Sequence, residues 1–339
     1  MNIPSYEPRV LVIGGNPLSW KTREIPATKE VINGVEAWAF TFWGDYKGYG
    51  IVKEQDIPNY DIIIANTNIG CLPEYLRLRN KLSSNSKWIA LIEGSASDYL
   101  KPQPYVKEAL DAAHIVNCIN RHSLSFLRAL TSSRVEYLGI PYPAENIRKF
   151  AVPFHKRKKE ILICPTLTTR WNDYLVARKL GLKFYGFEKV LTRKPKAIVH
   201  NYVNHKSFLN KWAVFDKVSG LYKDTSLQIK PMAPLETVFT ITGNSLLWIN
   251  LDDRYTWGRN VLDAAALQIP VISTRSTGHA EEFFPETLVD DEFDIDTAIN
   301  IGKRLITDEE FYKSVTDIPL EKFEHLSHES MKKTLLGWL

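Results

Sequence analysis

The residues best placed to do chemistry lie in one short stretch, where a glycine is followed by an arginine and then by an acid. Gly258, Arg259 and Asn260 begin a predicted helix, and Asp263 lies one turn further along it. The N-terminus of a helix presents N–H groups and the positive end of its dipole, so it can bind an anion. An arginine there adds a bidentate donor that suits phosphate, and the acid can accept two sugar hydroxyls. The stretch therefore predicts a pocket for a nucleotide diphosphate.

Two further loops could contact the same diphosphate. Thr168 and Arg170 follow a predicted strand and precede a helix, and hydroxyls with a guanidinium suit phosphate. Negative charge builds as a nucleotide diphosphate leaves, so two fixed cations, Arg170 and Arg259, would lower the barrier. Thr277 and Gly278 follow the next strand, where glycine permits close backbone contact. A surface salt bridge remains the alternative for Arg170 taken alone.

The N-terminal glycines favour ligand contact without favouring a dinucleotide. Gly14 and Gly15 follow the first predicted strand, where the missing Cβ lets backbone N–H groups approach a ligand. The complete G-x-G-x-x-G fingerprint is absent, which disfavours NAD. We predict that both glycines contact the nucleotide ligand, and a plain strand-ending turn is the alternative.

An acid, two aromatic residues and an arginine are candidates for contact with a second substrate that bears a hydroxyl group. Glu93 ends a buried strand, where a carboxylate could deprotonate an acceptor hydroxyl as a catalytic base. Trp43 and Tyr46 lie in a segment rich in rings and glycine, which is either an acceptor-binding loop or a turn between strands. Arg121 follows another strand and is expected to face the same cleft.

These residues need a scaffold of strands that alternate with helices. Strands are predicted at Arg9–Ile13, Glu36–Phe42, Asp61–Ala65, Trp88–Ile92, His114–Cys118, Arg134–Leu138, Glu160–Cys164, Leu182–Gly186, Leu246–Asn250 and Val271–Ser273. Helices are predicted at Trp171–Leu180, Pro234–Thr242 and Asp294–Leu305, among others. Short apolar strands separated by helices indicate parallel sheets in an α/β fold. The expected boundaries are 1–143, 144–318 and a terminal segment 319–339.

Composition fits a globular protein of two domains. The 339 residues include 43 basic and 39 acidic side chains, a net charge of +4, which is too weak to imply nucleic acid by itself. Three separated cysteines indicate reduced thiols, and Met1–Pro8 lacks the basic and apolar regions of a signal peptide. No apolar run is long enough to span a membrane. We therefore expect a cytoplasmic protein, and peripheral membrane contact stays open.

The stretch around Asp263 resembles the donor-binding segment of GT-B glycosyltransferases, in particular the pattern Glu, seven residues, Glu, followed by Ala-x-x-x-Gly-x-Pro-Val-Ile. The resemblance implies two Rossmann-like domains facing across a cleft, with the terminal segment crossing back to the first domain. It also implies that Asp263 holds the nucleotide ribose. Tyr255 stands where the first acid of the pattern should be. Either the sugar is held differently here, or Asp252 or Asp253 substitutes.

The resemblance implies a glycosyltransferase of the hexosyltransferase type, with a UDP- or GDP-sugar as donor and a glycan as acceptor. It favours a retaining reaction. The order of elements also resembles phage DNA glucosyltransferases, so a nucleic-acid acceptor is a second option. A sugar-nucleotide epimerase and a non-catalytic binding protein are further alternatives. No cofactor is expected, and no metal, because no Cys/His spacing for zinc and no Asp-x-Asp motif occurs.

Overall fold

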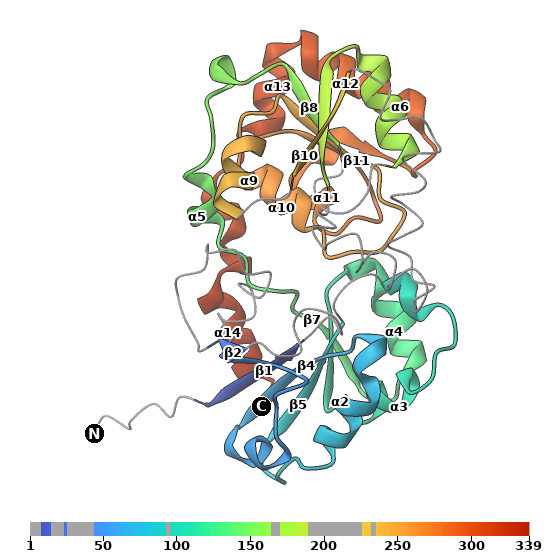
Figure 1. The fold of residues 1–339 in the computed structure, drawn as a ribbon, viewed down its shortest axis with the longest axis vertical. Helices are drawn as coiled ribbons and strands as arrows, with labels where there is room; N and C mark the ends of the chain where they lie inside the picture. Colours follow the sequence, from blue (N-terminus) through green and yellow to red (C-terminus); the bar gives the residue numbers. More distant parts are fainter. Residues whose placement is uncertain are drawn as a thin grey trace, which may run out of the picture.

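The computed structural model shows two parallel sheets arranged along the long axis of the molecule, each with its own helices (Figure 1). The structure describes residues 8–14, 24–25, 44–92, 96–163, 170–188, 226–231 and 235–338. Every strand of the first sheet precedes Leu138, and every strand of the second lies between Glu160 and Val289. The boundaries after residues 143 and 318 stay predictions.

The first sheet has seven strands in the order β2-β3-β1-β4-β5-β6-β7. They are β1 (Val10–Gly14), β2 (Glu24–Ile25), β3 (Asp45–Gly48), β4 (Ile62–Asn66), β5 (Lys87–Leu91), β6 (Ile115–Cys118) and β7 (Arg134–Tyr137). The helices of this half are α2 (Leu72–Arg79), α3 (Val106–Asp111) and α4 (Leu124–Leu130), with the 3-10 helices η1 (Glu54–Asn59), η2 (Ile69–Cys71), η3 (Ala96–Tyr99) and η4 (Arg121–Ser123). All neighbouring strands are parallel except β2 and β3, which are antiparallel.

The second sheet has six strands, all parallel, in the order β10-β9-β8-β11-β12-β13. They are β8 (Glu160–Ile163), β9 (Lys183–Glu188), β10 (Leu227–Pro231), β11 (Leu247–Asn250), β12 (Val271–Thr274) and β13 (Leu288–Val289). Its helices are α6 (Trp171–Leu180), α9 (Leu235–Thr242), α10 (Arg259–Ala266), α11 (Ala280–Phe283), α12 (Ile295–Thr307) and α13 (Glu309–Thr316), with η7 (Pro285–Thr287). In both sheets the strand order reverses beside the first strand, at β1/β4 and at β8/β11. Ligands bind at such points, outside the carboxyl ends of the strands.

The first sheet separates two apolar clusters because neighbouring residues in a strand point to opposite faces. Leu11 and Ile13 belong to one cluster, which also contains buried side chains of α2, α3 and α4. Val10 and Val12 belong to the other. That second cluster continues without a break into the core of the second sheet, so the two halves share one apolar core.

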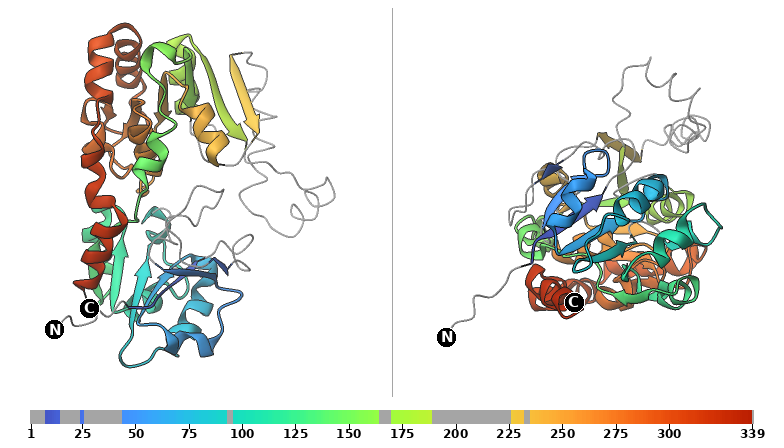
Figure 2. Two further views of the ribbon diagram at one scale, coloured as in Figure 1. Left: turned by 90° about the vertical axis from the view of Figure 1, so that its left-hand side faces the viewer. Right: turned by 90° about the horizontal axis from the view of Figure 1, so that it is seen from below.

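Two connecting segments complete this shared core. The linker after β7 contains α5 (Ala144–Arg148) and the 3-10 helix η5 (Phe154–Lys156), and the chain ends with η8 (Leu320–Leu326) and α14 (His328–Leu336). The helix α14 lies beside the first sheet, below the second one (Figures 1 and 2). Its Met331 and Leu335 join the shared cluster, and the backbone N–H of Tyr142 donates to the Leu326 carbonyl at 2.8 Å.

Most predicted elements occur within one or two residues of their expected bounds, but the aromatic segment differs. Residues 45–48 form β3, which pairs with β1, where we expected a loop. A buried tyrosine and a register set by β1 outweigh the turn-forming glycines on either side. The strand expected at Glu36–Phe42 lies outside the described residues. No helix of the described part of the chain is long and apolar enough to cross a membrane.

Candidate functional site

A group of charged side chains with two buried acids, Asp173 and Asp252, lies at the carboxyl ends of β8 and β11. Arg170 Nη2 lies 2.9 Å from the Asp252 carboxylate, and Arg170 Nη1 lies 3.9 Å from Asp173. Asp252 also accepts from Arg254, through Nε at 3.0 Å and through the backbone N–H at 3.1 Å. Asp252, which the resemblance offered as a substitute for the first acid, is buried, and two guanidinium groups compensate its charge.

The two acids of this group have opposite pKa shifts. Burial tends to raise the pKa of Asp252, but Arg254 and Arg170 outweigh burial and lower it, so this carboxylate stays ionised. Burial raises the pKa of Asp173 to about 7, although Arg170 and the Leu251 N–H, which donates at 2.7 Å, act in the other direction. Arg170 is therefore held between one firmly charged carboxylate and one that titrates near neutral pH.

The N-terminus of α10 packs against the loop after β12 through two glycines. Gly258 is the N-cap of α10, with φ +84°. A Cβ added to Gly258 would lie 1.7 Å from the Gly278 carbonyl oxygen, and one added to Gly278 would lie 2.3 Å from the Trp257 carbonyl oxygen. The Gly278 N–H also donates to the Thr256 carbonyl at 3.1 Å. Only glycine fits at either position, so the close approach fixes the start of the helix against the neighbouring loop.

Asp263 is buried and linked to the interdomain segment. The Tyr142 hydroxyl donates to the Asp263 carboxylate at 2.7 Å, and Arg259 Nε lies 3.6 Å from its other oxygen. Burial raises the pKa of Asp263, while Arg259 and Tyr142 oppose the rise. Each carboxylate oxygen has a further lone pair, so these contacts do not exhaust the hydrogen-bonding capacity of Asp263. The sequence missed the contact with Tyr142 because 121 residues separate the partners.

The first domain reaches these loops directly through Asn120. Its Nδ2 donates to the carbonyls of Thr256 at 2.7 Å and Ser276 at 2.9 Å. The loop after β12 is held further by the Ser276 hydroxyl, which donates to the Asp252 carbonyl at 2.6 Å. Thr277 is buried in the same loop, with its hydroxyl 3.3 Å from that of Thr274. The site is thus assembled by both halves of the molecule.

Of the acceptor-side predictions, Tyr46 and Arg121 lie within the described residues. Tyr46 is buried in β3, and a Cβ on Gly14 would lie 2.7 Å from its ring, so this glycine makes room for the tyrosine. Arg121 is exposed and lies over the Tyr137 ring, 4.9 Å from its centroid. Tyr255 is exposed, with its ring centroid 6.3 Å from that of His122.

The described structure brings most of the predicted donor residues together. Gly258, Arg259, Asn260 and Asp263 share α10 and its cap, and Gly278 contacts that cap. Arg170 joins them through Asp252, whose carbonyl anchors the loop of Thr277. Four predicted residues lie outside the described part of the chain, namely Gly15, Trp43, Glu93 and Thr168.

Known structures share this architecture at low sequence identity. No family model and no curated protein matches the sequence. The chain is similar to TarM of S. aureus, solved with UDP, fondaparinux and α-GlcNAc-glycerol, at TM-score 0.58 and 14% identity over 82% of this chain and 55% of that one. It is similar to sucrose-phosphate synthase of Thermosynechococcus elongatus at TM-score 0.59 and 14% identity, over 82% and 73%.

A third similar structure matches this chain along almost its whole length. An α-glucosyltransferase in complex with UDP and a 13-mer DNA containing an HMU base has TM-score 0.58 and 12% identity, over 98% of this chain and 99% of that one. By contrast, the chain spans about half the length of TarM. The similarities establish the fold, which is GT-B with two Rossmann-like domains, as the sequence predicted.

Proposed function

We propose that the chain is a glycosyltransferase of the hexosyltransferase type that uses a UDP-sugar as donor. The observation that carries the proposal is the packing of Gly258 against Gly278 beside the Arg170–Asp252 pair. It places a helix N-terminus and a fixed guanidinium at the point where strand order reverses, where an anionic ligand is expected. The similar structures solved with UDP support the choice of base.

Each residue of this group has a distinct proposed role. The N-terminus of α10 and Arg259 bind the diphosphate, while Arg170 stabilises the charge that develops on it. Asp263 accepts the ribose hydroxyls. Asp252 is held by two arginines, so we propose that it orients Arg170 rather than binding the sugar.

The proposed reaction transfers the sugar with retention of configuration. The bond between the anomeric carbon and the diphosphate oxygen breaks, and a bond to the acceptor oxygen forms. The acceptor's proton leaves with the departing phosphate. If inversion occurs instead, Glu93 is the candidate base, and Glu93→Gln should lower kcat about 100-fold or more. A retaining enzyme should lose much less activity, and NMR of the product's anomeric proton reports the configuration directly.

Thermal-shift measurements with UDP, GDP, ADP and TDP test the donor site. A ligand that binds only the folded state raises Tm by mass action, so UDP should raise Tm more than the other nucleotides. Arg259→Ala and Arg170→Gln should remove most of the UDP-dependent rise. Arg134→Ala is the matched control, because Arg134 is exposed on β7 and its guanidinium pairs with Glu136 on the same strand.

Donor turnover separates the proposed enzyme from its alternatives. A UDP-sugar that is converted to its epimer without an acceptor would indicate an epimerase. Nucleotide binding without transfer, across a broad panel of acceptors, would indicate a binding protein. No selective rise in Tm with any nucleotide would contradict the donor site itself.

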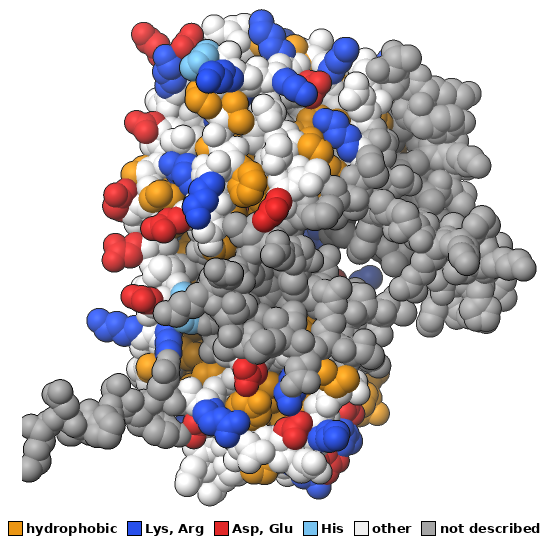
Figure 3. All heavy atoms as spheres, turned by 60° about the vertical axis from the view of Figure 1, so that its left-hand side comes forward, with side chains coloured by type: hydrophobic (Ala, Val, Ile, Leu, Met, Phe, Trp, Pro, Cys, Tyr) orange, Lys and Arg blue, Asp and Glu red, His pale blue; other side chains and the backbone are white. Residues whose placement is uncertain are grey.

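The proposed function also includes the chemical class of the acceptor. We propose a glycan, in keeping with the mild charge and with the face shown in Figure 3, where Lys and Arg side chains are interspersed with Asp and Glu. One observation favours a DNA base as the second candidate, because the DNA-bound α-glucosyltransferase matches this chain nearly end to end. Transfer of labelled sugar to glycan acceptors, with duplex DNA containing HMU assayed in parallel, decides between them.

A further inference from the structure

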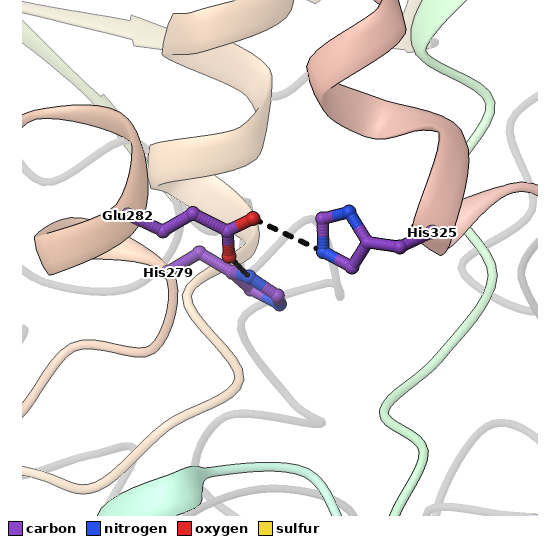
Figure 4. A group of neighbouring side chains, drawn as sticks. All are labelled: His279, Glu282 and His325. Atoms are coloured by element: carbon purple, nitrogen blue, oxygen red, sulfur yellow. Dashed lines mark hydrogen bonds and ion pairs between the residues drawn. The ribbon is translucent and has the colours of Figure 1, made fainter.

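We propose that His279, Glu282 and His325 form a binding site for a zinc-type divalent metal ion. His279 Nδ1 lies 3.0 Å from one oxygen of the Glu282 carboxylate, and His325 Nε2 lies 3.1 Å from the other. One potential ligand atom from each residue lies within 4.8 Å of the other two. Figure 4 shows the three side chains converging, two from the segment of α11 and one from η8.

The local backbone explains why the first two ligands meet. His279 is the N-cap of α11, with φ +63°, and Glu282 follows three residues later in the helix. Residues three apart on a helix lie on the same side. His325 comes from the 3-10 helix η8 of the terminal segment, so the third ligand depends on how that segment packs.

The ligand types and their spacing suit zinc. Two imidazoles and a carboxylate are a common zinc set, with the fourth position left for water. Tetrahedral ligands about 2.0–2.1 Å from an ion lie roughly 3.3 Å from each other. The two contact distances of 3.0 and 3.1 Å, which join the histidines to different oxygens of Glu282, are close to this spacing, and the three ligand atoms all lie within 4.8 Å of one another.

The three side chains differ in burial. The His279 side chain is 1% exposed, and its Nε2 has no hydrogen-bond partner among the described residues. A buried imidazole nitrogen without a partner is costly. A metal ion bound through Nδ1, the nitrogen that faces Glu282, would replace that hydrogen bond with a coordination bond. Glu282 and His325 are 29% and 41% exposed, so water can reach the open side of the ion.

A nearby positive charge limits the affinity of the proposed site for a metal ion. With neutral histidines the three side chains carry one negative charge. Arg121 of the first domain interacts electrostatically with both His279 and Glu282, and its positive charge opposes a cation. Removing this charge with Arg121→Gln should strengthen metal binding severalfold.

The ion would connect two parts of the molecule that meet at the candidate donor site. His279 directly follows the Thr277–Gly278 turn, and His325 lies in the segment that leads to α14. Bound metal would therefore hold the terminal segment against the end of the donor loop. This inference does not depend on the proposed glycosyltransferase activity.

Metal titration of the full chain tests the site. Chelator-treated protein without a histidine tag is titrated with Zn²⁺ by calorimetry, and Tm is measured with Zn²⁺ and after EDTA. We expect one Zn²⁺ per chain and a rise in Tm that EDTA reverses. Co²⁺ in place of Zn²⁺ should give the visible absorption of a tetrahedral site.

Variants of two ligands, His325 and Glu282, distinguish zinc bound at this site from zinc bound elsewhere on the chain. His325→Gln and Glu282→Gln should each lower Zn²⁺ affinity at least tenfold, while His155→Gln, at an exposed histidine of η5, should not. No Zn²⁺ binding by the native chain, or equal binding by His325→Gln, would overturn the proposal. UDP-dependent Tm shifts in the same samples report on the donor site separately.

Discussion

Strand order reverses at two points, the charged edge beside β8 and β11 and the neutral edge beside β1 and β4. The two edges share a topology but differ in chemistry. Beside β8 and β11 the polar groups are charged, with Arg170 held by Asp252. Among the described residues beside β1 and β4 they are neutral: the Tyr49 hydroxyl donates to the Asn66 carbonyl at 2.5 Å, and Thr67 shares a hydrogen bond with Tyr99 at 2.6 Å.

The difference shows how one fold can accommodate two kinds of ligand. Fixed cations suit a diphosphate, whose charge increases as it leaves. Neutral hydrogen-bonding groups suit a hydroxyl-bearing acceptor, which brings no charge to be compensated. The second sheet therefore provides the proposed donor side, and the first sheet the acceptor side.

The largest expected effect comes from the glycines at these two edges. Gly258→Ala should lower the free energy of unfolding by about 4 kcal/mol or more, because the added carbon meets a backbone carbonyl and φ is positive. Gly14→Ala should cost less, since its added carbon meets the ring of Tyr46, which can shift. Urea denaturation measures both.

Gly181→Ala is the matched control for Gly258. Its φ is +73°, but no heavy atom lies within 4 Å of an added Cβ. Only the left-handed backbone then contributes, at about 1–2 kcal/mol. An equal loss at Gly181 and Gly258 would contradict the packing of the helix cap against Gly278.

Asp173 should give the charged edge a pH-dependent stability that the neutral edge lacks. Its folded pKa of about 7 lies above the unfolded value of 3.8, so the folded state binds more protons. Stability should therefore fall as pH rises from about 4 to 7, by roughly 3–4 kcal/mol. Asp173→Asn keeps an acceptor for the Leu251 N–H and should flatten this slope. Tm between pH 4.5 and 8 measures it, and an unchanged slope in Asp173→Asn would assign the dependence elsewhere.

Arg170→Gln should separate the functions of the two edges. Losing a charge-assisted contact with the diphosphate should weaken UDP binding by about 10- to 100-fold. Thr67→Val, at the neutral edge, should leave the UDP affinity within about twofold. Calorimetric titration measures both variants, and equal losses would contradict the assignment of the donor to the second sheet.

The smallest effect is expected where the two domains meet. Asn120→Ala removes two hydrogen bonds to the loops of Thr256 and Ser276, which should cost about 1–2 kcal/mol. It should also make those loops exchange amide hydrogens faster, as mass spectrometry would show. His122→Ala removes a contact of 3.5 Å between His122 Nε2 and the Glu281 carboxylate, both of which are exposed. It should change the free energy of unfolding by less than about 0.5 kcal/mol. Loops equally protected in Asn120→Ala and in the native chain would show that this contact does not order the site.

Local patterns predicted the elements well. The helix at Trp171–Leu180 was predicted at its observed bounds, and Gly258 was expected to open α10. In both cases neighbouring residues carry the signal, through apolar periodicity or a glycine at the helix start.

Long-range pairings were not predictable in the same way. Nothing in the sequence links Tyr142 to Asp263, and burial of Asp252 depends on Arg170, 82 residues earlier in the chain. His279 and Glu282 have the spacing of a helical pair, but His325 joins them only through the packing of η8. Charged residues are normally exposed, so their burial can be inferred only when the partner is known.

The shared apolar core has a consequence for engineering. Phe323, Leu326, Met331 and Leu335 of the terminal segment are buried in the cluster that spans both sheets. A chimaera that exchanges the second sheet alone would leave these side chains facing an unfamiliar surface. The natural unit of exchange is therefore discontinuous, since either half must travel with the matching part of the chain's last twenty residues.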